Sequence, residues 1–138
     1  MGKSINELMS SNPATVESSS TVAEAAQIMK KEDVGLVPVV EGERLVGTLT
    51  DRDISIRVVA EGRDPQSTSV SDVASSDVVT IDPQQGLDEA LRLMAEHQVR
   101  RLPVVEEDGR LVGVVAQADV AQHADASQTG RLVEEISE

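Results

Sequence analysis

A hydroxyl and two carboxylates follow an apolar run at residues 47–53, GTLTDRD. An ionised carboxylate only accepts hydrogen bonds, so Asp53 could hold both vicinal hydroxyls of a sugar. The hydroxyl of Thr50, three residues earlier, could bind a phosphate oxygen next to the free N–H groups of a helix start. The same T-x-x-D spacing is typical of a capping box that closes the first turn of a helix. Both interpretations are compatible, and Gly47, which lets backbone approach closely, favours binding.

The same frame returns at residues 113–119, GVVAQAD. Its last residue, Asp119, matches Asp53, but Ala116 stands where the first loop has Thr50. Because alanine has no hydroxyl, this second motif is expected to bind weakly, to stay empty, or to take a ligand resembling a nucleoside.

These loops belong to a unit that occurs twice in the chain, with an offset of 65 residues that becomes 66 after a one-residue insertion in a turn. Each copy predicts a short helix, a strand, a helix, a hairpin of two strands and a further helix, an α+β fold. One face of each longer helix is predicted to be apolar, through Val22, Ala25, Ala26 and Met29 in one copy and Leu87, Ala90, Leu91 and Met94 in the other.

The repeat sets the expected domain boundaries. We expect a first domain at residues 1–62, a linker at 63–68, a second domain at 69–125 and a C-terminal tail at 126–138. A single copy buries too little apolar surface to be stable alone. The two copies are therefore predicted to pack sheet to sheet about an approximate twofold axis, which would create two related clefts.

Arg100 and Arg101 form a basic pair in an acidic chain, which has 12 Lys and Arg against 25 Asp and Glu and a net charge of −13. The first copy has Gly35 and Leu36 at the equivalent positions, so the fold does not require arginine there. The pair could bind an anion, or it could be a surface pair that balances neighbouring glutamates.

Composition excludes several classes of partner. The chain has no Phe, Tyr or Trp and therefore no ring on which a nucleobase could stack. Its negative charge repels nucleic acid and anionic membrane surfaces. Without cysteine or an apolar run of spanning length, we expect a soluble, cytoplasmic protein.

Catalytic and metal chemistry lack candidate residues in the sequence. His97 and His123 are the only histidines, and neither has a second ligand at metal-binding spacing. There is no nucleophile–base pair and no glycine-rich phosphate loop. The sequence predicts a non-enzymatic protein that requires no metal and no cofactor.

The order of strand, helix, L-P-V-V hairpin and G-h-x-T-x-x-D motif resembles the cystathionine β-synthase (CBS) domain, and two in tandem resemble a Bateman module. The resemblance covers about residues 4–124. HQVRRLPVV at 97–105 with GTLTDRDI at 47–54 is also similar to small stand-alone actinobacterial CBS-pair proteins of the hypoxic-response type. The resemblance to paired CBS domains implies a regulatory module that senses an adenosine nucleotide, commonly AMP, ADP, ATP or S-adenosylmethionine, in a cleft between the copies.

The resemblance also implies roles for residues. The main cleft would use Thr50, Asp53, Val79, Thr80, Ile81, Arg100 and Arg101. There the aspartate would hold ribose, the hydroxyl and the arginines would hold phosphate, and the backbone of residues 79–81 would meet adenine. The weaker second cleft would use Thr15, Val16 and Asp119.

The family resemblance further implies a homodimer formed through helices. Apolar residues that could supply part of this surface are Ile28, Ile54, Ile56, Val58 and Val59. The alternative is a stress-related interaction module with the same fold and no physiological nucleotide, whose partner is an unknown protein.

Overall fold

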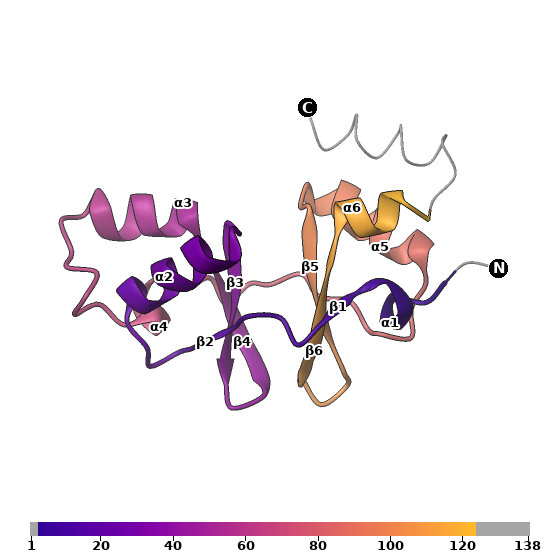
Figure 1. Ribbon diagram of the computed structural model, residues 1–138, viewed down its shortest axis with the longest axis horizontal. Coiled ribbons are helices and arrows are strands. Elements are labelled where there is room, and N and C mark those ends of the chain that lie inside the picture. Colours follow the sequence, from indigo (N-terminus) through magenta and orange to yellow (C-terminus); the bar gives the residue numbers. More distant parts are fainter. Residues whose placement is uncertain (1–2, 124–138) are drawn as a thin grey trace. The chain divides into compact units, whose positions relative to one another are not determined.

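The computed structural model describes residues 3–123, and these form two compact units (Figure 1). Unit 1 contains residues 3–13 and 79–123, and unit 2 contains residues 14–78. The predicted tail at 126–138 and the last two positions of the predicted second domain, 124 and 125, lie outside the described residues.

The compact units divide the chain differently from the sequence copies. The first residues of each copy pack with the hairpin of the other copy, so each unit is assembled from both. The predicted linker at 63–68 is packed into unit 2, because the carbonyls of Pro65 and Thr68 accept the N–H groups of Ala23 and Val22 at the start of a helix.

Unit 2 is a three-stranded sheet covered by helices. Its sheet has the order β2-β3-β4, with β2 parallel and β4 antiparallel to β3. The elements are β2 (Val16–Glu17), α2 (Val22–Glu32), β3 (Leu36–Glu41), β4 (Arg44–Thr50), α3 (Asp51–Ile54), a π-helical turn (Ser55–Val59) and α4 (Val70–Val73). Helices α2, α3 and α4 all lie on one side of the β3–β4 hairpin (Figure 1).

A side-chain cap begins helix α2, and a residue in the left-handed conformation ends it. The Thr21 side chain caps it by accepting the N–H of Glu24 at 3.2 Å, and Asp33 ends it in the left-handed conformation with φ of 56°. Val22, Ala25 and Met29 form its buried face, as predicted, but Ala26 is exposed. Neighbouring positions of a helix point about 100° apart, and in α2 the core covers Ala25 and leaves Ala26 in solvent.

The short helix α4 belongs to the second copy but completes the core of unit 2. Val70 and Val73 are buried in the same cluster as Val37 and Leu49 of the hairpin. Directly after it, the backbone of Ser75 pairs with Thr48 through two hydrogen bonds of 2.9 Å.

Gly47 permits this close approach. A Cβ atom at Gly47 would lie 2.6 Å from the carbonyl oxygen of Ser75, well inside van der Waals contact. The structure therefore gives Gly47 a role in packing of the chain on itself.

Unit 1 repeats this arrangement with the roles of the two copies exchanged: residues 3–13 of the first copy pack with residues 79–123 of the second. Its sheet has the order β1-β6-β5 and is antiparallel. The elements are α1 (Ile5–Leu8), β1 (Ser10–Ser11), α5 (Leu87–His97), β5 (Arg101–Val105), β6 (Leu111–Ala116) and α6 (Gln117–Ala121). The predicted strand at Thr80-Ile81 is reduced to one parallel bridge between Ile81 and Val104.

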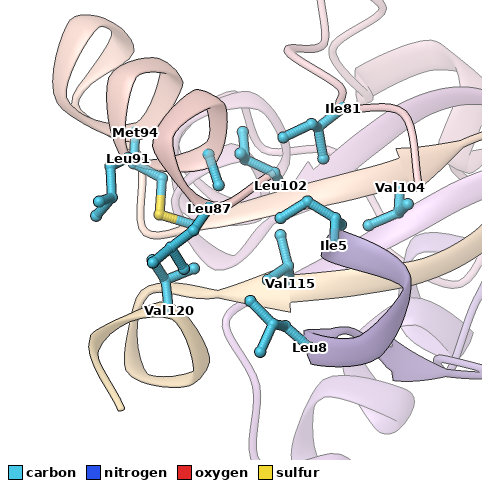
Figure 2. Packing of buried hydrophobic residues seen from close by; sticks show 11 residues of the cluster. Ile5, Leu8, Ile81, Leu87, Leu91, Met94, Leu102, Val104, Val115 and Val120 are labelled. Atoms are coloured by element: carbon cyan, nitrogen blue, oxygen red, sulfur yellow. The ribbon is translucent and has the colours of Figure 1, made fainter. Parts of the chain in front are cut away.

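The core of unit 1 joins α1 to the elements of the second copy. Figure 2 shows Ile5 and Leu8 of α1 packed with side chains of β5, β6 and α6. The predicted apolar face of α5 is buried in full, through Leu87, Ala90, Leu91 and Met94. Gly113 plays the part of Gly47, because a Cβ there would lie 2.8 Å from the carbonyl oxygen of Ser10.

Candidate ligand-binding motifs

Thr50 and Asp53 form a complete capping box at the start of α3. The Thr50 hydroxyl oxygen accepts the N–H of Asp53 at 3.0 Å, and Asp53 Oδ2 accepts the N–H of Thr50 at 2.9 Å. The capping interpretation is confirmed. These bonds still leave the hydroxyl hydrogen of Thr50 as a donor and Asp53 Oδ1 as an acceptor, and the Asp53 side chain is 17% exposed.

Arg57 is a neighbour of this motif that the sequence reasoning missed. Its Nε lies 4.0 Å from Asp53 Oδ1, and its Nη1 donates to the Val73 carbonyl at 3.0 Å. The spacing of four residues between Asp53 and Arg57 on a helix is the signal that could have identified it.

A second carboxylate, that of Asp51, lies close to the Thr50 motif. The N–H of Asp51 donates to the Gly35 carbonyl at 2.9 Å. A Cβ at Gly35 would lie 3.1 Å from Asp51 Oδ2, so this carboxylate lies directly over the glycine. On the neighbouring strand, Leu36 is the direct partner of Thr50.

The second motif keeps half of the capping box. Asp119 Oδ2 accepts the N–H of Ala116 at 3.0 Å, as Asp53 does for Thr50. Ala116 has no side-chain oxygen that could accept the N–H of Asp119, as the Thr50 hydroxyl accepts the N–H of Asp53. The aspartate that both copies share thus has the same local structural role in each unit.

Arg100 and Arg101 lie beside the motif of their own copy. The Arg100 carbonyl accepts the N–H of Gln117 at 2.7 Å, and Arg101 is the direct cross-strand partner of Ala116. Both arginines are exposed. The structure therefore brings the basic pair together with Ala116 and Asp119 in unit 1, whereas Thr50 and Asp53 belong to unit 2.

The two backbone segments predicted to contact adenine also belong to different units. Residues 79–81 lie in unit 1, and Thr15 and Val16 lie in unit 2. The N–H of Ile81 donates to the Pro103 carbonyl at 3.1 Å, and its own carbonyl accepts the N–H of Val105 at 3.0 Å. Because sheet pairing uses the only N–H of Ile81, that residue has no backbone donor to offer a base.

The pKa of Glu89 is lowered from its ordinary value, chiefly by a side-chain hydrogen bond from Arg92. This ion pair lies on the surface of α5 and belongs to neither motif. Within residues 3–123, no group of three or more His, Cys, Asp or Glu could hold a metal ion. A search of the same residues finds no helix with the length and apolar character needed to cross a membrane.

Two copies of a helix-covered hairpin, each ending in a G-x-x-x-x-x-D helix start, define a tandem CBS protein. Residues 5–59 and 70–125 both match the CBS domain family, and the chain belongs to that family. It is a CBS-pair regulatory module.

Curated relatives cover almost all of this chain. The CBS domain-containing protein YhcV of Bacillus subtilis is 48% identical over 118 residues, which are 86% of this chain and 83% of the relative. Hypoxic response protein 1 of Mycobacterium tuberculosis is 40% identical over 118 residues, 85% of this chain and 82% of the relative. The chain is therefore similar to CBS pairs of the hypoxic-response type.

Solved structures lead to the same class. The crystal structure of Hypoxic Response Protein I, which holds two coordinated zinc ions, matches with a TM-score of 0.81 and 38% identity over 89% of this chain and all of that chain. CBSX2, solved in complex with AMP, matches with a TM-score of 0.76 and 25% identity over 88% of this chain and 95% of that chain.

Proposed function

We propose that this CBS pair is a non-enzymatic regulatory module that binds an adenosine nucleotide of the AMP, ADP and ATP class. The observation that carries the proposal is the Thr50–Asp53 capping box, which holds both side chains in place and leaves one donor and one acceptor for a ligand. The likeness to CBSX2, which was solved with AMP, supports the choice of adenosine ligand.

Asp53 is proposed to hold the ribose. Its Oδ1 is an ionic acceptor and is not used by the cap, so it can accept from a ribose hydroxyl. The Thr50 hydroxyl already accepts a bond from the backbone, and its hydrogen can therefore point to a phosphate or ribose oxygen. The cap fixes both groups before the ligand arrives, which lowers the entropic cost of binding.

Arg100 and Arg101 are proposed to supply positive charge for phosphate. Guanidinium groups bind phosphate through charge-assisted, often bidentate hydrogen bonds. Neither arginine makes an ion pair with another residue of the part of the chain that the structure describes. Their hydrogen-bond donors are thus available to an external anion.

Adenine is proposed to lie against aliphatic side chains and to be selected by backbone groups. The chain offers no aromatic ring for stacking. Val79 and Thr80 for one motif, and Thr15 and Val16 for the other, are the proposed backbone contacts. Recognition by backbone donors and acceptors should favour adenine over guanine, because the two purines present opposite donor and acceptor patterns at position 6.

Calorimetric titration of the full chain with adenosine, AMP, ADP and ATP tests the proposal directly. Saturable binding of at least one of them, with GMP clearly weaker than AMP, is the expected result. No heat and no saturation with any adenosine ligand at millimolar concentration would leave the protein as an interaction module without a physiological nucleotide.

An exposed apolar surface favours a role in protein contacts as well. Ile56 is 46% exposed and Val59 is 68% exposed, both on the π-helical turn after α3. We propose that this surface pairs two copies of the chain, and that the dimer works in the cytoplasm, where a protein without cysteine suits the reducing conditions. The alternative is that an unknown protein partner covers it.

A further inference from the structure

Arg57 lies between the Asp53 motif of the first copy and a helix of the second. Its Nε is 4.0 Å from Asp53 Oδ1, and its Nη1 donates to the Val73 carbonyl at 3.0 Å. Val73 is the last residue of α4, and the final carbonyls of a helix have no partner within the helix itself. One guanidinium thus faces the proposed ribose acceptor and the end of α4 at the same time.

The Asp53 carboxylate has a neighbour at each of its oxygens. Oδ2 accepts the N–H of Thr50 at 2.9 Å, and the Arg57 guanidinium lies beside Oδ1. A carboxylate held at one oxygen only can still turn about that bond, whereas a positive charge beside the other oxygen limits the movement. At 4.0 Å the guanidinium is too far away to hydrogen-bond to Oδ1. Arg57 therefore orients the free acceptor of Asp53 without occupying it.

Helix α4 is also joined to β4, the strand that leads into the motif. Ser75, two residues after the end of α4, exchanges two backbone hydrogen bonds of 2.9 Å with Thr48. On its other side, α4 buries Val70 and Val73 in the core of unit 2. The position of the Val73 carbonyl, and with it the position of Arg57, therefore depends on how α4 packs against the hairpin.

The other unit lacks this link. The repeat places His123 at the position of Arg57 and Leu8 at the position of Val73. Among residues 3–123, no hydrogen bond or ion pair joins the His123 side chain to Asp119 or to Leu8. The connection through a guanidinium belongs to the motif that has the hydroxyl.

We propose that Arg57 is a positioning residue that couples the Asp53 motif to α4, so that a ligand on Asp53 and the packing of α4 each favour the other. Coupling between two sites is reciprocal by thermodynamic necessity. If the α4 carbonyl holds Arg57 where it orients Asp53, a ligand on Asp53 in turn stabilises α4 on the hairpin. Because α4 begins the second copy, the ligand strengthens the contact between the two copies within unit 2. This inference rests on the proposed binding of an adenosine nucleotide and adds a structural consequence of it.

Calorimetry with adenosine on the full chain tests the effect on affinity. Adenosine is uncharged, so removing a charge from the protein leaves its long-range attraction unaltered. Arg57→Leu should weaken adenosine binding about fivefold or more, which is the lower end of ordinary coupling between sites. Arg63→Leu is the matched control, because Arg63 also contacts α4, through a 3.4 Å ion pair with Asp72 and not with Asp53. This control should leave adenosine affinity unchanged.

Amide hydrogen exchange with and without saturating adenosine tests the effect on α4. The N–H groups of Val70, Ser71 and Ala74 donate to backbone carbonyls at 2.8, 3.0 and 2.9 Å, so their exchange reports on α4. Any ligand slows exchange by stabilising the folded state as a whole, and α2 of the same unit measures that general effect. Adenosine should slow α4 more than α2 in the unaltered chain and in Arg63→Leu, but equally in Arg57→Leu.

A double-mutant cycle shows whether Arg57 acts through Asp53. In the Asp53→Ala background, Arg57→Leu should cause no further loss of adenosine affinity. A further loss as large as in the unaltered chain would mean that Arg57 acts independently of Asp53. If Arg57→Leu does not fold, Arg57→Gln keeps a donor for the Val73 carbonyl and removes the charge beside Asp53. It should weaken adenosine binding in the same way, and unchanged affinity would overturn the inference.

The failure of this inference and the failure of the proposed function give different results. Equal effects of Arg57→Leu and Arg63→Leu on adenosine affinity and on α4 exchange would reduce the role of Arg57 to general stabilisation of α4. The unaltered chain would still bind adenosine, and the proposed function would stand. Failure of the unaltered chain to bind either adenosine or AMP would remove both.

Discussion

The carboxylate of Asp53 accepts the backbone N–H of Thr50 at 2.9 Å, and the hydroxyl of Thr50 accepts that of Asp53 at 3.0 Å. This reciprocal pair orders the oxygen atoms that follow the apolar strand β4. Structural capping and ligand binding thus use different atoms of the same two side chains, and substitutions can separate them.

Asp53→Ala should lower both stability and nucleotide affinity. Loss of the cap costs about 1 kcal/mol of the free energy of unfolding. Loss of a charged acceptor for ribose, worth about 1.5–3 kcal/mol, should reduce affinity at least tenfold. Asp53→Asn keeps an acceptor for the Thr50 N–H, so it should retain most of the stability and still bind nucleotide less well.

Thr21→Ala is the control for this experiment, because Thr21 caps α2 in the same unit and belongs to neither motif. It should lower the free energy of unfolding by a similar amount and leave affinity unchanged. Denaturant titration and calorimetry on the three variants provide the measurements. If Asp53→Ala and Thr21→Ala lower the free energy of unfolding equally and both leave nucleotide affinity unchanged, Asp53 serves only as a helix cap.

Gly47→Ala should destabilise the protein by about 1–3 kcal/mol, as overpacking in a close contact does. The new methyl group would meet the Ser75 carbonyl oxygen at 2.6 Å, and backbone must move to relieve this. Gly86→Ala is the control, since no atom lies within 4 Å of the Cβ position there. Urea denaturation measures both, and a Gly47→Ala variant as stable as Gly86→Ala would contradict the packing explanation.

Val59→Asp should convert a dimer into a monomer. Val59 is 68% exposed, and a carboxylate cannot be buried in an apolar interface without a partner. Light scattering at micromolar concentration measures the mass, and the circular dichroism spectrum should be unchanged. Ala60→Asp, at the neighbouring exposed position, should leave the mass at that of the dimer. An unaltered chain that is monomeric at this concentration would end the dimer proposal.

Ile5→Ala and Val70→Ala test the exchange of segments between copies. Ile5 lies in the core of unit 1 and Val70 in the core of unit 2, and both are fully buried. Ile5→Ala should cost about 2–5 kcal/mol and increase amide hydrogen exchange in β5 and β6. Val70→Ala should increase exchange in β3 and β4 instead. The reverse pattern would mean that each segment packs within its own copy.

Local patterns in the sequence were sufficient for the repeated elements. The period of the apolar residues predicts α2 and α5, because one helix turn sets which side chains share a face. The runs around Gly42 and Asp108-Gly109 predict the hairpins, since these turn residues allow the required backbone. The T-x-x-D spacing predicts the cap at Thr50. All of these depend on residues close together in the chain.

Tertiary structure decided what covers each face. An apolar pattern shows that Ile5 and Val70 must be buried, but either of the two hairpins could accept them, and only packing selects the hairpin of the other copy. The same holds for Gly47, which the sequence alone links to a ligand and the structure links to Ser75. Arg101 meets Ala116 because strand register joins residues far apart in sequence. Periodicity carries no information on register between distant strands, and it is register that places the basic side chain beside the motif without a hydroxyl.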